Sequence, residues 1–92
     1  MKKYKLLYDK RYLKALEKIP HHLRGKVSEK VENLATNPRP EGYTKLNGSK
    51  KTPLYRIRSG DYRVVYTIQD HELIVIVIEL GHRREIYQNL FL

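Results

Sequence analysis

The stretch Leu54–Tyr87, LYRIRSGDYRVVYTIQDHELIVIVIELGHRREIY, decides the fold of this 92-residue chain. Two turn signals, Ser59-Gly60 and Asp70-His71, divide it into three runs rich in β-branched and aromatic residues. This pattern predicts an antiparallel meander of three strands. The last run holds six consecutive apolar residues, Leu73–Ile78, so we expect it to be buried on both faces near the centre of the sheet.

The turns also predict which residues face each other across the meander. With Ser59-Gly60 as a two-residue turn, Arg56 faces Arg63 on the side opposite the apolar residues. With Asp70-His71 as the second turn, Tyr66 faces Val75. Two arginines side by side repel each other by a few tenths of a kcal/mol or more. A surface built in this way is best explained if an anion lies over it.

The residues before the meander predict one strand and two helices. Tyr4–Tyr8 has the composition of a strand. Asp9 can cap a helix that runs to about Ile19, and Pro20 then begins a second helix that runs to about Thr36. Tyr43–Leu46 predicts a small edge strand. The fold class is therefore α+β: an N-terminal strand, a two-helix hairpin, and a three-strand antiparallel meander packed on the helices.

Composition favours a basic cytoplasmic protein with an anionic partner. The chain has 19 Lys and Arg against 10 Asp and Glu, a formal net charge of +9, which attracts polyanions such as nucleic acid. The alternative is a basic surface kept for solubility. Nucleic acid is the leading partner, with an acidic membrane surface or an acidic protein behind it. No apolar run approaches the roughly 20 residues that span a bilayer, and no membrane is assigned as a partner. The absence of cysteine excludes disulfides and thiolate metal sites.

Several classes of enzyme are excluded by missing motifs. The sequence has no Walker loop, no dinucleotide-type glycine pattern, no nucleophile elbow and no carboxylate pair spaced for glycoside hydrolysis. The histidines are not at metal-ligand spacing with acidic residues, so we expect no metal and no cofactor. His82 alone, beside Arg83, is a possible site residue. The alternative for His82 is a plain surface position.

What remains is a group of cationic side chains with one tyrosine. Guanidinium groups bind phosphate bidentately and stay charged, so they suit a site that holds a scissile phosphate. Cations favour the phenolate form of tyrosine, so Tyr87 is a candidate base for a ribose 2′-OH. The alternative is that the arginines are solvated strand positions. Their bunching favours phosphate binding, because six basic residues lie between Gly42 and Gln69 against Asp61 alone: Lys45, Lys50, Lys51, Arg56, Arg58 and Arg63.

The order strand, two helices, meander, together with LYRIRSGDYRVVY (residues 54–66) and GHRREIY (residues 81–87), resembles the RelE/ParE superfamily of bacterial toxins, and most closely its RelE-like branch. The resemblance covers essentially the whole chain and implies a single RelE-like toxin domain over residues 1–92. It implies the toxin of a type II toxin–antitoxin pair, an mRNA interferase that enters the 30S A site of the ribosome, against 16S rRNA, and cleaves mRNA there without a metal. The 2′-OH would attack the adjacent phosphate. A cognate antitoxin protein would neutralise the toxin by wrapping its basic surface.

The resemblance also implies roles for individual residues. Arg56 and Arg58 match basic residues of the active-site strand, and Arg63 matches a phosphate-binding arginine in a G-x-Y-R motif. Arg83 matches the cationic residue taken to stabilise the transition state or protonate the leaving group. Tyr87 matches the tyrosine proposed to orient or activate the nucleophile.

Three departures from the family pattern concern the acid–base assignment. The best-studied branch has lysines at the positions of Arg56 and Arg58, so these two would act electrostatically. The segment before Tyr87 is shorter, so Arg83 and Arg84 can exchange roles. The Glu–His pair of a sister branch is not convincingly reproduced by Glu79 and His82. Two other functions share this fold: a ParE-like toxin that poisons DNA gyrase by binding alone, and a non-toxic relative that only binds RNA or an antitoxin.

Overall fold

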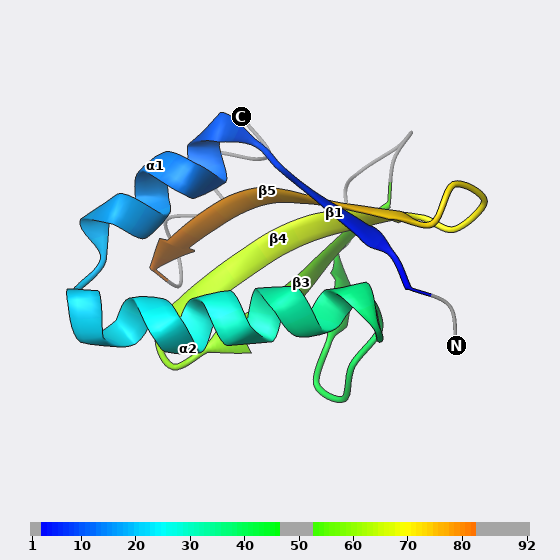
Figure 1. The fold of residues 1–92 in the computed structure, drawn as a ribbon. Coiled ribbons are helices and arrows are strands. Elements are labelled where there is room, and N and C mark those ends of the chain that lie inside the picture. The colour runs from blue at the N-terminus through cyan, green and yellow to red at the C-terminus, as the bar shows by residue number, and fades with distance from the viewer. Residues whose placement is uncertain (1–2, 47–52, 83–92) are drawn as a thin grey trace.

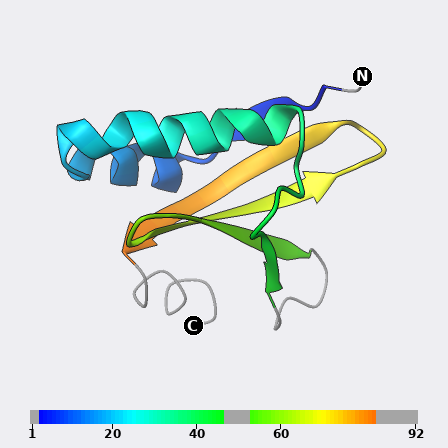
Figure 2. The same ribbon diagram turned by 90° about the horizontal axis from the view of Figure 1, so that it is seen from below.

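The computed structural model describes residues 3–46 and 53–82, which form a five-stranded sheet with two helices against one face (Figures 1 and 2). In chain order the elements are β1 (Lys5–Tyr8), α1 (Lys10–Lys18), α2 (His21–Glu32), the 3₁₀ turn η1 (Asn33–Ala35), β2 (Thr44–Leu46), β3 (Leu54–Ser59), β4 (Tyr62–Gln69) and β5 (Ile74–His82). No helix within these residues is long and apolar enough to cross a membrane.

The strand order across the sheet is β1-β5-β4-β3-β2. β1 runs parallel to β5, and each of the other neighbouring pairs is antiparallel. The prediction of an N-terminal strand, a helical hairpin and an antiparallel meander is therefore confirmed. The apolar strand β5 has a strand on each side, as its composition indicated, and the short edge strand β2 is present.

The first hairpin turn differs from the expected one by one residue. Ser59 pairs with Tyr62, so the two turn residues are Gly60 and Asp61. Gly60 has a φ of +60°, and a two-residue hairpin turn of this kind prefers glycine at its first central position. The predicted pair of Arg56 and Arg63 is consequently wrong.

The second turn is longer than predicted. β4 ends at Gln69, which pairs with Ile74, so residues 70–73 form a four-residue loop. Leu73 adopts a φ of 55° in this loop and is not part of the strand. The pair of Tyr66 and Val75 is also wrong, because Tyr66 pairs with Val77.

A β-bulge interrupts the pairing of β4 with β5. Val65 pairs with Glu79, but the next residue, Tyr66, pairs with Val77. Ile78 is therefore the extra residue on β5. A bulge changes which side chains point to each face of a strand, and here it places Glu79 on the face opposite the helices.

The helices begin where the sequence indicated, and the second ends sooner. The carboxylate of Asp9 accepts a hydrogen bond of 2.8 Å from the backbone N–H of Arg11 and caps α1. α2 follows Pro20 directly and ends at Glu32, where η1 continues the chain as a tighter turn.

The core lies between the two helices and the sheet. Its fully buried side chains come from both layers: Tyr12, Val27, Val31 and Leu34 from the helical layer, and Val64, Tyr66, Val75 and Val77 from the sheet. Burying side chains of this size contributes about 1.5–3 kcal/mol each. The hydroxyl of Tyr66 donates a hydrogen bond of 2.7 Å to the carbonyl of Pro38, so its one polar group is satisfied inside the core.

An ion pair joins three separate segments at the end of the sheet where β4 turns into β5. Arg39, in the loop after η1, donates hydrogen bonds of 3.2 and 2.9 Å to the two oxygens of Asp70. Tyr4 donates a third, of 2.8 Å, from its hydroxyl. Arg39 also lies 5.6 Å from the centre of the Tyr55 ring. The hydrogen bonds from Arg39, with that from Tyr4, lower the pKa of Asp70 to about 2.

This ion pair predicts a pH-dependent effect of Asp70→Asn. Because the pKa of Asp70 is lower in the folded state than its ordinary value near 3.8, its contribution to stability is present above about pH 4 and is lost as the pH falls towards 2. We expect the variant to unfold at lower urea concentration than the unmodified protein at neutral pH, with a difference that shrinks between about pH 4 and pH 2. Asp61→Asn, in the first turn, is the matched control. A difference that stayed constant over this pH range would contradict the assignment.

Candidate functional site

Three of the predicted arginines share the face of the sheet opposite the helices, which we call the arginine face: Arg56, Arg58 and Arg63. Along β3, Arg56 and Arg58 alternate with Tyr55 and Ile57, which are buried in the core. Arg58 is paired directly with Arg63 across the β3–β4 hairpin, and the Cβ atoms of such partners lie about 4.5–5.5 Å apart. The structure therefore brings these three arginines to one face and pairs Arg58 directly with Arg63.

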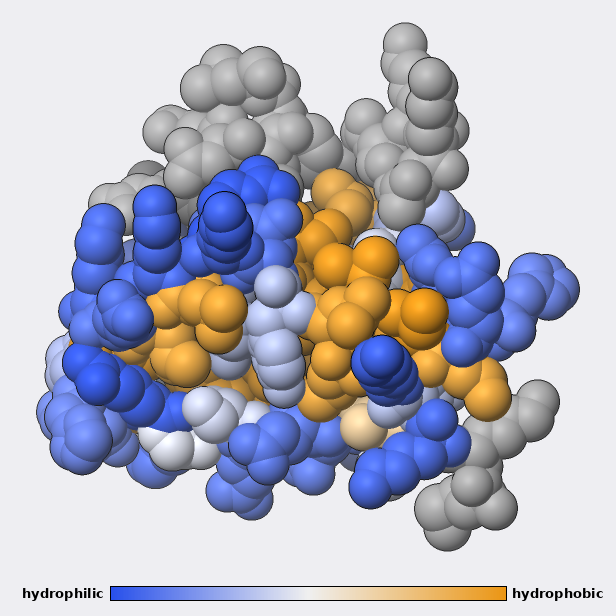
Figure 3. All heavy atoms as spheres, turned by 45° about the horizontal axis from the view of Figure 1, so that its top comes forward, coloured by the Kyte–Doolittle hydropathy of each residue, from blue (hydrophilic) through white to orange (hydrophobic). Residues whose placement is uncertain are grey.

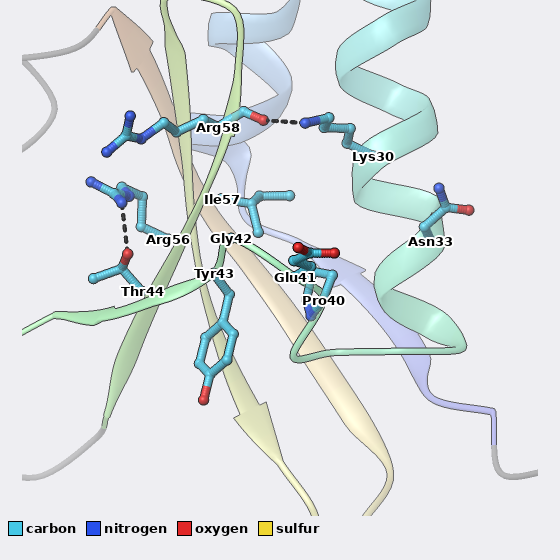
Figure 4. Close-up of a pocket in the computed structure, with 10 residues that line it drawn as sticks. All are labelled: Lys30, Asn33, Pro40, Glu41, Gly42, Tyr43, Thr44, Arg56, Ile57 and Arg58. Atoms are coloured by element: carbon cyan, nitrogen blue, oxygen red, sulfur yellow. Dashed lines mark hydrogen bonds between the residues drawn. The ribbon is translucent and has the colours of Figure 1, made fainter.

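A hydrogen bond from the edge strand holds Arg56. Its Nη2 atom donates a bond of 2.7 Å to the Oγ1 atom of Thr44, the residue opposite it on β2 (Figure 4). Figure 4 also shows the guanidinium groups of Arg56 and Arg58 on the same side of β3, with α2 on the other. An arginine side chain has about 2 kcal/mol of rotamer entropy. Fixing Arg56 in advance reduces the part of this cost that a ligand must meet on binding.

Arg63 has a donor that lacks an acceptor. Its Nε atom is buried and has no hydrogen-bond partner within residues 3–46 and 53–82. A buried donor left in this state costs about 1–3 kcal/mol. An anionic oxygen placed over the arginine face would supply the missing acceptor.

Lys30 also contributes to this region from the helical layer. Its Nζ atom donates a hydrogen bond of 2.8 Å to the backbone carbonyl of Arg58 (Figure 4). No motif in the sequence pointed to a role for Lys30 or Thr44. The sequence predicted the edge strand that contains Thr44. It did not predict that this strand pairs with the one that carries Arg56, because a polar loop separates the two strands along the chain.

Glu79 and His82 lie on opposite faces of β5. Glu79 is buried on the arginine face, and its Oε2 atom is 3.9 Å from Nη1 of Arg11. His82 is exposed and pairs with Tyr62, against which its ring packs edge-on at 5.5 Å between centroids. His82 lines a cavity together with Val27 of α2, so it is on the helical side, away from the arginines. The two residues are therefore not placed to act as a pair.

The other predicted site residues lie outside the described residues. These are Lys50 and Lys51, which precede β3, and Arg83, Arg84 and Tyr87, which follow β5. Their roles stay predictions.

Comparison with known proteins shows the family to which the chain belongs. Residues 6–87 match the family of the ParE toxin of the type II toxin–antitoxin system parDE. The chain belongs to the RelE/ParE superfamily. The chain is 33% identical over 90 residues to the putative toxin RelE1 of Methanocaldococcus jannaschii. The aligned residues make up 95% of the chain and 98% of RelE1. The chain is also 34% identical over 86 residues to the mRNA interferase toxin RelE of Escherichia coli K12. The aligned residues make up 91% of the chain and 90% of that relative.

A solved structure gives the same result for the fold. The archaeal RelE–RelB complex from Pyrococcus horikoshii OT3 contains a chain that superimposes with a TM-score of 0.78 at 29% identity, covering 89% of this RelE/ParE chain and 97% of that one. The RelE-like branch predicted from the two meander motifs is therefore confirmed.

If the arginine face binds RNA, the contact between Thr44 and Arg56 predicts that Thr44→Val weakens this binding. Valine keeps the shape of threonine and suits a strand, but it cannot accept the hydrogen bond from Arg56. We expect about a fivefold to tenfold loss of affinity for a short fluorescent RNA, since hydrogen bonds to charged groups contribute about 1.5–3 kcal/mol and part of this is recovered from water. Thr44→Ser, which keeps the oxygen, should bind like the unmodified protein. Equal affinities of the valine and serine variants would show that this contact does not matter for binding.

Proposed function

We propose that this chain is the toxin of a type II toxin–antitoxin pair and acts as a ribosome-dependent mRNA endonuclease. The observation that best supports this is the arginine face, where Arg56, Arg58 and Arg63 converge and the buried Nε of Arg63 lacks an acceptor within the described residues. A phosphate group matches both the charge and the hydrogen-bonding requirement of such a surface. The similarity to a protein named mRNA interferase toxin RelE supports the same conclusion.

The reaction would be an intramolecular transesterification of the RNA backbone. The 2′-oxygen of one ribose attacks the adjacent phosphorus and loses its proton, with Tyr87 as the candidate base. The bond to the 5′-oxygen of the next nucleotide breaks and that oxygen takes a proton from water, while Arg83 or Arg84 is the candidate for stabilising its negative charge. The products are a 2′,3′-cyclic phosphate and a 5′-hydroxyl. The protein therefore needs to hold the phosphate, stabilise its added negative charge and accept the proton of the 2′-hydroxyl.

The described arginines would perform the electrostatic part of this task. Arg58 and Arg63 lie side by side on adjacent strands, so a phosphate between them can accept hydrogen bonds from both. Arginine does not give up its proton at physiological pH, so these groups stabilise charge and do not act as acids or bases. Arg56, held by Thr44, would bind the next phosphate or add to the field at the first.

Two macromolecular partners follow from this proposal, in addition to the mRNA. The net charge of +9 suits the A site of the 30S subunit, which is built largely of 16S rRNA. A ribosomal target would put the activity in the cytoplasm. The second partner would be a cognate antitoxin. Figure 3 shows hydrophobic atoms exposed among hydrophilic ones, and large apolar side chains that reach the surface include Leu7, Tyr8 and Leu13 on β1 and α1, each 38–46% exposed. Exposed apolar groups of this kind suit a protein partner.

Arg63→Ala tests the proposal. Removing one preorganised donor to a charged transition state typically lowers a rate by about 10²–10³, so primer extension on a message translated during induction should lose its cleavage products. The unmodified protein should give cuts in register with codons, and growth arrest should follow the same pattern. Lys14→Ala, an exposed cation on α1, is the control and should cleave normally. Unchanged A-site cleavage by Arg63→Ala would contradict the proposal.

A second candidate function is favoured by the family match to ParE toxins. In that case the chain would poison DNA gyrase by binding and would have no chemistry of its own. Inhibition of DNA supercoiling by the purified protein, without cleavage of translated mRNA, would favour this alternative. The similarity to RelE proteins over nine-tenths of the chain makes the nuclease the better supported function.

A further inference from the structure

A groove of about 570 Å³ lies beside the arginine face, at the edge of β3 (Figure 4). β2 pairs with β3 from Leu54 to Arg56, so the groove lies where β3 extends past that pairing. One wall is the end of α2 and the start of η1, with Lys30 and Asn33. The other is the loop that leads into β2, with Glu41 and Tyr43. A space of this volume is in the range of small-molecule sites, about 300–1,000 Å³.

The groove is continuous with the arginine face. Its lining includes Arg56 and Arg58 themselves, together with Ile57, whose side chain points from β3 towards α2 (Figure 4). The hydrogen bond from Lys30 to the carbonyl of Arg58 joins α2 to the strand and places an ammonium group in the groove. That ammonium has two further donors available for a ligand. Any RNA strand held by the arginines would pass next to this opening.

We propose that this groove binds the base of one RNA nucleotide, next to the phosphate held on the arginine face. The inference rests on the proposed function for the identity of the polymer. The polar groups of the groove suit a base better than a second phosphate. The carboxylate of Glu41 would repel a phosphate, whereas it can accept hydrogen bonds from an exocyclic amino group. Asn33 can both donate and accept. Tyr43, whose ring lies 6.0 Å from that of Tyr55, is 39% exposed and is the aromatic residue that a base could stack on.

The chemistry also indicates a preference among bases. Cytosine presents an amino group that can donate a hydrogen bond to the carboxylate of Glu41, while uracil presents a carbonyl oxygen at the same position. A carboxylate facing that carbonyl would leave two acceptors opposed. The groove should therefore favour cytosine over uracil.

Amide chemical shifts of the ¹⁵N-labelled protein test where each ligand binds. Cytidine 5′-monophosphate should shift the amides of Asn33, Glu41 and Gly42, which line the groove, as well as those of the arginine face. Inorganic phosphate should shift those of the arginine face alone, and neither should shift Lys14, on α1. If cytidine monophosphate shifted only the resonances that phosphate shifts, the groove would not be a base site.

Glu41→Gln tests the preference. We expect the affinity for cytidine monophosphate to fall about fivefold or more relative to that for uridine monophosphate. Glu72→Gln, an exposed carboxylate in the β4–β5 loop, is the matched control and should change neither affinity. An equal gain in affinity for both nucleotides would mean that Glu41 only repels phosphate, and would overturn the inference.

These measurements separate this inference from the proposed function, because they need no cleavage. Shifts at the groove in a protein that does not cleave translated mRNA would support the groove and refute the nuclease. Codon-register cleavage by a protein whose groove resonances never move would do the opposite.

Discussion

The pleat of β3 is the constraint on which the arginine face depends. Tyr55 and Ile57 are buried in the core between sheet and helices, so the residues between and after them must project from the other side. A slip of one residue would exchange the two sets and place guanidinium groups in the core. Burial of two apolar side chains thus fixes the direction of Arg56 and Arg58, and the hairpin turn at Gly60 then places Arg63 beside Arg58.

This arrangement is unfavourable for the free protein. Neighbouring arginines repel each other, and the buried Nε of Arg63 has no acceptor within the described chain. The well-packed core and the ion pair of Arg39 with Asp70 offset these costs elsewhere in the molecule. Local violations of the usual rules of stability are characteristic of functional sites. Here both violations are relieved by the same kind of ligand, an anion with several acceptor oxygens.

Sequence patterns were sufficient for the elements and their packing, and insufficient for the pairing between strands. Hydrophobic periodicity and the cap at Asp9 predicted the helices, and the apolar run in β5 predicted its place between other strands. The register was wrong because Ser59-Gly60 and Gly60-Asp61 are both plausible turns, and the preference for glycine at the first position decided between them. The bulge at Ile78 and the contact of Thr44 with Arg56 depend on tertiary pairing that no local pattern encodes. For this reason the face of β5 that carries Glu79 became visible only in the structure, whereas its separation from His82 follows from strand alternation alone.

Binding of the RNA phosphate backbone by the arginine face would make the affinity depend on salt. Each phosphate contact to a single strand contributes about 0.7 to the slope of log affinity against log salt concentration. We expect Arg58→Gln to give a slope shallower by about this amount than that of the unmodified protein, while Lys14→Gln on α1 keeps the original slope. An identical slope for Arg58→Gln and the unmodified protein would show that Arg58 does not contact the phosphate backbone.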